Sequence, residues 1–174
     1  MKCPNCQEIL TTIDYEGVEI ETCSSCHGEW LDSDELGKIV QLREVKFDEG
    51  ARRAIAEATA ITGVKLENVD RDLTCPKCGG TTDAINYGSD SGIILDRCTQ
   101  CHGFWLDNEE LEKVQMLVEG WEDLLPDDLK EYSPMLHDIE VKLDEEDDVK
   151  LSRLPFVGGF INSVMNGIID LTGN

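Results

Sequence analysis

Apolar positions recur along this 174-residue chain with two different periods. In the stretch VEIET, residues 18–22, the valine and isoleucine fall on one face of an extended chain and the two glutamates on the other. A period of two is typical of a strand with one buried face. The preceding Tyr-Glu-Gly predicts a turn, with Gly17 supplying a conformation that side chains disfavour. We therefore expect a hairpin whose first strand covers about residues 8–14.

Helical periodicity follows the hairpin. Asp32 and Glu35, in DSDEL, have the spacing of a helix N-cap and its third-position partner, and Leu36 and Ile39 then recur at a helical interval. A second helix is predicted further on, and it should end at Gly63. Its apolar side would consist of Ala51, Ala54, Ile55, Ala58 and Ile61.

The whole pattern occurs twice. Aligning Cys3 with Cys75 brings the next cysteine and the hairpin residues into register, and three extra residues in the second copy fall in the loop at 88–92. The second copy therefore predicts another hairpin, with Gly92 in its turn, and another helix. The residues that indicate this helix are Asp107, Glu110, Leu111, Val114 and Leu117.

The chain changes character beyond Gly120, where the repeat ends. DEEDD at 144–148 is a like-charge block, which is typical of a solvated segment. Residues 154–171 then turn apolar around one narrow polar stripe, which predicts a helix that docks on this chain, on a second copy or on a protein partner. The apolar face comprises Phe156, Phe160, Ile161, Val164, Ile168 and Leu171.

Charge limits the classes of partner. The net charge is −22, and a surplus this large repels nucleic acid and anionic membrane surfaces, so we expect neither as a partner. Arg52 and Arg53 form the only adjacent basic pair, and we expect them to face the protein's own carboxylates. The stretch MKCPNCQEIL lacks an apolar run of signal-peptide length, which favours a cytoplasmic protein.

Eight cysteines carry the candidate chemistry, in two sets with the spacing Cys-x2-Cys-x16/19-Cys-x2-Cys. Two such pairs on neighbouring loops are a recurrent way to hold zinc with four thiolates, whereas disulfides are rare in the cytosol. The first set is Cys3, Cys6, Cys23 and Cys26, and the second is Cys75, Cys78, Cys98 and Cys101. We therefore expect two Zn²⁺ ions per chain.

The cysteine pattern also admits other interpretations. Cys-x-x-Cys-His at Cys23 and Cys98 is also the haem-attachment signature, but haem would leave four cysteines without a purpose. Four thiolates also suit iron, as in rubredoxin, so zinc against iron stays open. His27 and His102 are better explained as orienting residues than as ligands. Gln7 stands where the second copy has Gly79, a residue that eases such a turn.

Trp30 and Trp105 follow the second cysteine pairs. They could stack on nucleic acid, but a leucine after each and a helix beyond favour a core position. The four stretches CPNC, CSSCHGEWLDSDEL, CPKC and CTQCHGFWLDNEEL resemble the transcription-factor-IIB-type zinc-finger family of zinc ribbons. This resemblance implies a structural zinc at each set, and the family name implies transcription.

We therefore predict a small α+β fold with two repeated zinc-ribbon hairpins, each followed by an α-helix, plus a helical C-terminal segment. The expected domains are ribbon 1 at 1–43, a helical linker at 44–74, ribbon 2 at 75–119, and the acidic and apolar segment at 120–174.

The leading functional hypothesis is a non-enzymatic, zinc-binding adaptor that acts through a protein partner or self-association, with no small-molecule substrate. A closed four-thiolate shell leaves no position for a catalytic water. The alternatives are a transcription-associated factor that contacts nucleic acid or RNA polymerase, and a rubredoxin-like iron electron carrier.

Overall fold

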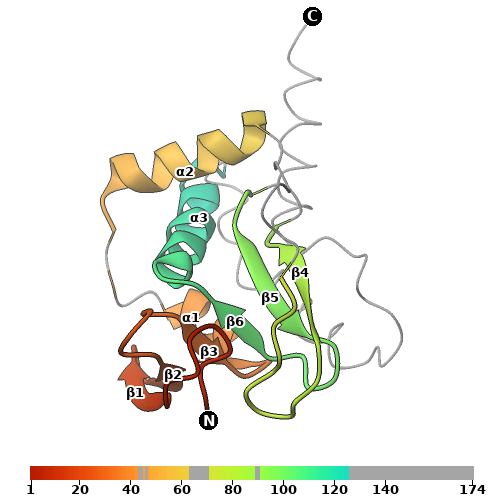
Figure 1. Cartoon of the computed structure of the whole chain (residues 1–174). Helices are drawn as coiled ribbons and strands as arrows, with labels where there is room; N and C mark the ends of the chain where they lie inside the picture. Colours follow the sequence, from red (N-terminus) through yellow and green to blue (C-terminus); the bar gives the residue numbers. More distant parts are fainter. Residues whose placement is uncertain (43–44, 46, 63–70, 89–90, 126–174) are drawn as a thin grey trace, which may run out of the picture.

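The computed structural model describes residues 1–42, 45, 47–62, 71–88 and 91–125 (Figure 1). The predicted helix at 154–171 lies outside these residues. Within them the fold is small and α+β, with one antiparallel sheet and three helices. In chain order the elements are β1 Thr11–Tyr15, β2 Val18–Thr22, β3 Glu29–Leu31, α1 Glu35–Leu42, α2 Glu49–Thr62, β4 Thr82–Asn86, β5 Ile94–Cys98, β6 Phe104–Leu106 and α3 Glu110–Leu124.

Both predicted hairpins form, and each gains a third strand. β1 pairs with β2 and β4 with β5, while Gly17 and Gly92 take positive φ values of 82° and 80° in the turns. The burial of β2 alternates as its sequence predicts, with Val18 and Ile20 buried. The first strand begins at Thr11, later than expected, because the preceding residues belong to the cysteine turn.

The two ribbons share one sheet. Its strand order is β1-β2-β3-β6-β5-β4, and the short strands β3 and β6 join the halves in antiparallel pairing. Trp30 lies directly opposite Trp105 at the centre of this joint. The order reads the same from either edge, so the halves are related by an approximate two-fold axis through the tryptophan pair.

The helices begin at Glu35 and Glu110, three residues after the predicted N-caps Asp32 and Asp107, and only half of the expected capping box forms. The N–H of Asp32 donates to the Glu35 carboxylate at 2.7 Å, and Asp107 and Glu110 repeat this bond at 2.7 Å. The reciprocal bond is made by the backbone instead, because the N–H of Glu35 donates to the Asp32 carbonyl at 3.1 Å. The aspartate side chains are thereby available for other contacts.

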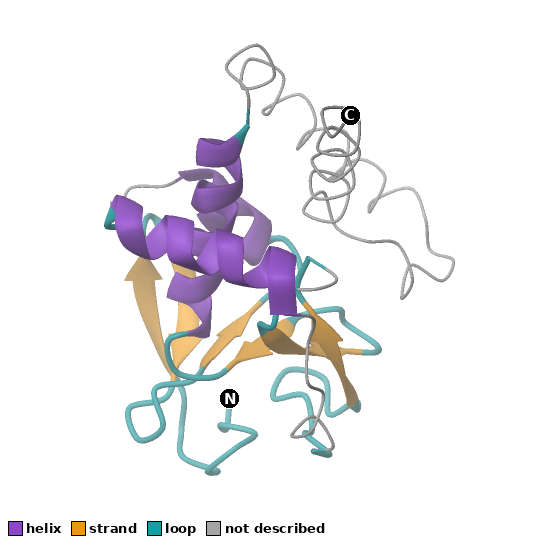
Figure 2. Cartoon of the chain, turned by 90° about the horizontal axis from the view of Figure 1, so that it is seen from above, coloured by secondary structure: helices purple, strands orange, loops and turns teal. Residues whose placement is uncertain are grey.

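The three helices gather on one side of the sheet (Figure 2). Residues of both ribbons fill the core beneath them, including Ile20, Leu31, Leu95 and Leu106, which are fully buried. Successive side chains of a strand point to opposite faces, so Trp30 and Trp105 face away from this core. They belong to a second buried cluster, which also contains cysteines.

Helix α2 packs across α3 at Gly120. A Cβ at Gly120 would lie 2.5 Å from the Arg52 carbonyl oxygen, so only glycine permits this approach. Ile55 and Ala56 make the apolar contact from α2. Ala51 and Ala54, which periodicity placed on the apolar side, are exposed because the helix meets α3 at a crossing point and is not buried along its length.

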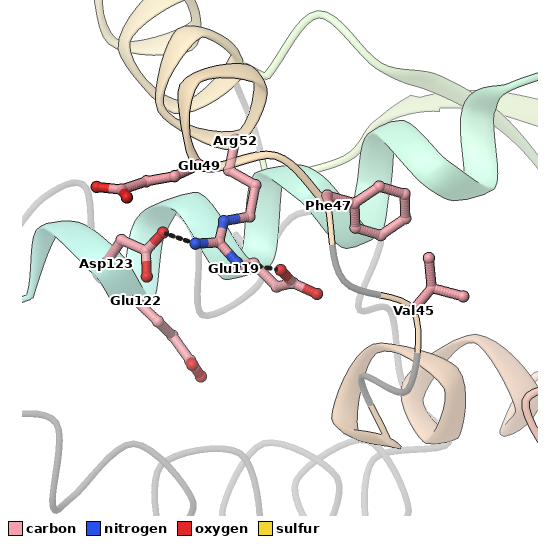
Figure 3. Close-up of a pocket in the computed structure, with 7 residues that line it drawn as sticks. All are labelled: Val45, Phe47, Glu49, Arg52, Glu119, Glu122 and Asp123. Atoms are coloured by element: carbon pink, nitrogen blue, oxygen red, sulfur yellow. Dashed lines mark hydrogen bonds and ion pairs between the residues drawn. The ribbon is translucent and has the colours of Figure 1, made fainter.

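Arg52 and Arg53 face the protein's own carboxylates, as predicted. The Arg52 guanidinium bridges Glu119 at 2.8 Å and Asp123 at 2.9 Å on α3 (Figure 3). Arg53 pairs with Glu57 one helical turn away, at 2.7 Å on the exposed face. The first arrangement ties two helices together, whereas the second lies within one helix.

Replacing Arg52 with glutamine should lower the free energy of unfolding by about 2 kcal/mol, because Glu119 would stay buried without its charged partner. Urea denaturation of the zinc-loaded protein measures this. Arg53→Gln is the matched control, and it should cost far less stability because its ion pair is exposed. Equal losses for the two variants would contradict the assignment.

Candidate metal centres

The four cysteine pairs adopt the same tight turn, here called a knuckle. In each one, the N–H of the first cysteine donates to the carbonyl five residues later, and that cysteine's own carbonyl accepts from the residue after the second cysteine. The residue that follows the second cysteine is left-handed in every knuckle. The four positive φ values are 67° at Gln7, 57° at His27, 76° at Gly79 and 59° at His102.

Gln7 therefore forms the same turn as Gly79. Its side-chain amide donates to the Cys3 carbonyl at 3.2 Å, which offsets part of the cost of the left-handed backbone. The absence of glycine in the first copy does not change the knuckle.

The knuckles bring the predicted cysteines together as two separate groups of four. In each group all four sulfurs lie within 4.8 Å of one another, and each group draws on one ribbon only. In the first group, Cys3 Sγ lies 3.5 Å from Cys26 Sγ, and Cys6 Sγ lies 3.4 Å from Cys23 Sγ. The corresponding distances in the second group are 3.6 Å for Cys75 and Cys101 and 3.4 Å for Cys78 and Cys98.

This donor set fits a tetrahedral metal ion. Zinc binds thiolates at about 2.3 Å, so the corners of its tetrahedron lie about 3.8 Å apart. The sulfur separations fall close to that value and well beyond the roughly 2.05 Å of a disulfide. The chain therefore has two four-cysteine sites, each able to hold a metal ion.

The thiols of each site differ in acidity. Burial raises the pKa of Cys3 and of Cys75 to about 12. Cys23 and Cys98 are also buried, but hydrogen bonds from two backbone N–H groups of their own knuckles outweigh burial and lower the pKa to about 7. Cys23 and Cys98 therefore ionise more readily than Cys3 and Cys75, which are expected to lose their protons only when a cation binds.

Two glycines adjoin the sulfurs. Burial raises the pKa of Cys26, and the backbone N–H of Gly28 opposes that rise by hydrogen bonding to the sulfur. Gly103 does the same for Cys101. Hydrogen bonds of this kind stabilise a thiolate, which is the form that binds metal.

Metal affinity should fall as the pH falls. In the metal-free fold, burial raises the pKa of two thiols per site above the ordinary thiol value, so at least these two protons must leave when an ion binds as four thiolates. Affinity is thus gained as pH rises towards these values and lost as it falls, by at least about 100-fold per pH unit, because at least two protons are released. Competition with a chelator between about pH 6 and pH 8 measures this slope. A slope below one proton per ion would contradict it.

The histidines do not join the sites. Both His27 and His102 are exposed, and neither belongs to the two groups of metal-type side chains found among the described residues. Their left-handed backbone closes the second knuckle of each ribbon. The expectation that they are not ligands agrees with this geometry.

The tryptophans are fully buried, so they cannot stack on nucleic acid. Their contact is one that the sequence did not predict. A Cβ at Gly28 would lie 2.3 Å from Cζ2 of Trp105, and one at Gly103 would lie 2.4 Å from Cζ2 of Trp30. Each indole therefore rests on the knuckle of the opposite ribbon. The only sequence signal for this was the repetition of Gly-x-Trp in both copies.

Asp32 and Asp107 hold the indoles. Trp30 Nε1 donates to Asp32 at 3.3 Å, and Trp105 Nε1 donates to Asp107 at 3.1 Å. Asp32 also accepts from Lys77, which lies inside the first knuckle of the other ribbon, at 2.5 Å. In each Trp-Leu-Asp sequence, the aspartate thus orients the indole that packs on the opposite ribbon.

The described helices include none with both the length and the apolar character needed to cross a bilayer. No curated protein and no solved structure matches the chain significantly. A family model described as transcription factor zinc-finger matches residues 2–42 and 74–115, and each match contains one complete set of four cysteines. Residues 2–42 and 74–115 therefore match the transcription factor zinc-finger family as two tandem zinc ribbons.

Proposed function

We propose that this chain is a zinc-binding, non-enzymatic adaptor that holds two structural zinc ions and acts through protein–protein interaction. The observation that carries the proposal is the closure of both sites by four cysteine sulfurs. Four thiolates complete the tetrahedral shell of zinc and leave no position for a water or substrate. The family match favours zinc over the iron of a rubredoxin-like carrier. Thiols that must stay reduced suit a cytoplasmic location.

Two features, one of the sequence and one of the structure, support a protein partner. One is the apolar segment at 154–171, which lies outside the described residues. The other is an open hollow of about 430 Å³ between α2, α3 and the segment before α2 (Figure 3). It is lined by Val45, Phe47, Glu49, Arg52, Glu119, Glu122 and Asp123. The apolar Val45 and Phe47 lie beside acidic side chains, two of which already pair with Arg52, so the apolar wall is what suits a partner here.

Metal content and partner capture test the two halves of the proposal separately. Elemental analysis of the purified protein should give two zinc ions per chain, and fewer than one would contradict the metal assignment. Iron would colour the protein and favour the carrier alternative.

For the adaptor role, partner capture and oligomeric state should change when the chain is truncated after Lys150 or when Val45 is replaced by aspartate. Val45 is 42% exposed, so its replacement tests the hollow without disturbing the core.

A transcription-associated role is the second candidate, and the description of the matching family favours it. Contact with RNA polymerase would be a special case of the adaptor role. Direct nucleic-acid binding is disfavoured by the net charge of −22 and by the burial of both ribbon tryptophans. Mobility shift with DNA and RNA probes over a range of salt decides this, and sub-micromolar binding with a steep salt slope would establish direct contact.

A further inference from the structure

The two metal sites share one buried cluster. It contains both ribbon tryptophans and is closed by Leu10 and Leu73. Its cysteines come from both ribbons, and they are Cys3, Cys23, Cys75 and Cys98. Neither site therefore has a separate apolar surrounding of its own.

The tryptophans cross between the ribbons within this cluster. Trp105 packs on Gly28 and Trp30 packs on Gly103, with spacing too close for any Cβ at either glycine. Non-bonded contacts of a Cβ essentially never fall below 3.0 Å, so the indoles lie directly against the glycine backbone. The second knuckle of each ribbon, which ends at Gly28 or Gly103, is thus covered by the other ribbon.

These glycines serve the sulfur ligands directly. The Gly28 carbonyl accepts from the Cys23 N–H at 2.9 Å, while its own N–H faces the Cys26 sulfur. Gly103 makes the same pair of contacts with Cys98, at 2.8 Å, and with Cys101. A shift of either glycine would therefore move two of the four ligands of its site.

An ion pair between the ribbons adds to the contact that the tryptophans make. Lys77 lies between Cys75 and Cys78 and pairs with Asp32, the residue that also holds the indole of Trp30. Ribbon 1 thereby contacts both knuckles of the second site. The ion pair is partly exposed and contributes little by itself, so the indole is the main link.

We propose that Trp30 and Trp105 are positioning residues for the metal site of the opposite ribbon, so that the two sites bind their ions with positive coupling. This inference rests on the proposed zinc occupancy. An ion at one site orders the strand that carries the tryptophan needed at the other, and this lowers the ordering cost of the second binding event.

The test compares Trp105→Ala and Trp30→Ala in the full, zinc-loaded chain by amide hydrogen exchange. Trp105→Ala should speed exchange about tenfold more at residues 23–28 than at 98–103, and Trp30→Ala should do the reverse. Trp121→Ala is the matched control, because this tryptophan is also buried but belongs to the other cluster. It should loosen neither knuckle selectively.

Metal release gives a second measurement. In each alanine variant one of the two ions should pass to a chelator about tenfold faster than in the wild type, and the other should follow faster as well. Phenylalanine at either position should bring the rate of metal release most of the way back to the wild-type rate, because it keeps an aromatic ring on the glycine. If an alanine variant does not fold, the phenylalanine variants must show the same crossed pattern in weaker form.

Three outcomes would overturn the proposal. Each tryptophan variant could loosen its own knuckle first, or both knuckles equally, which would mean a general role in the core. The two ions could leave the wild type independently, which would exclude coupling. A wild-type protein without metal would contradict both this inference and the proposed function, whereas the first two outcomes leave the proposed function intact.

Discussion

Replacing Cys98 with serine is expected to leave one metal ion per chain and to lower the free energy of unfolding by at least about 5 kcal/mol. Cys98 is fully buried, and its sulfur lies 3.4 Å from that of Cys78. A serine hydroxyl does not ionise at neutral pH and cannot take the place of the thiolate, so the second site loses its ion. The first site keeps its ligands because each group of four comes from one ribbon.

Elemental analysis after gel filtration measures the number of ions, and urea denaturation measures the stability. His102→Asn is the matched control, since it lies in the same knuckle and asparagine tolerates the left-handed backbone that His102 adopts, at φ 59°. The control should keep both ions. Retention of both ions by the serine variant, or loss of both, would show that the ligand sets are assigned wrongly.

Gly28→Ala is expected to cost about 3 kcal/mol, although it adds a single methyl group. The new Cβ would lie 2.3 Å from Cζ2 and 2.9 Å from Cη2 of Trp105, and the indole is fully buried and has no room to retreat. The carbonyl of Leu106, at 3.0 Å, blocks movement on another side. Either the indole or the knuckle must shift, so the first site should also bind its ion more weakly.

Gly37→Ala provides the control for this substitution. Gly37 lies on α1 with nothing within 4 Å of a built Cβ, and alanine in a helix is favoured over glycine by about 1 kcal/mol. The control should therefore be as stable as the wild type or slightly more so in urea denaturation. A Gly28→Ala protein of wild-type stability would mean that the packing of Trp105 on this knuckle is looser than described.

Local elements were predictable because each rests on a local cause. The spacing of the cysteines gives the knuckles, and glycine with alternating residues gives the hairpins. The position of Arg52 opposite carboxylates followed from the surplus of acidic residues alone. In each case the residues that determine the structure are neighbours in the sequence or are set by composition.

The joint between the ribbons was not predictable in the same way. β3 and β6 have three residues each, too few to show a period, and every side chain of β6 is buried. A pattern of alternation cannot reveal a strand that is covered on both faces. The repeat suggested two similar units, but nothing in it specified that Trp30 would contact the opposite unit. The eight cysteines were grouped correctly in space, while their role as metal ligands stays a prediction.

The mirrored strand order has a consequence for how this sheet is held together. Pairing of a surface with its own equivalent is the arrangement of an isologous dimer, here enclosed within one chain. Two separate ribbons would associate according to their concentration in solution and would dissociate on dilution. Joined by residues 43–73, they face each other at an effective concentration in the millimolar range or above, which dilution cannot lower. A ribbon expressed alone would present β3 as an unpaired edge, and its assembly would depend on its concentration.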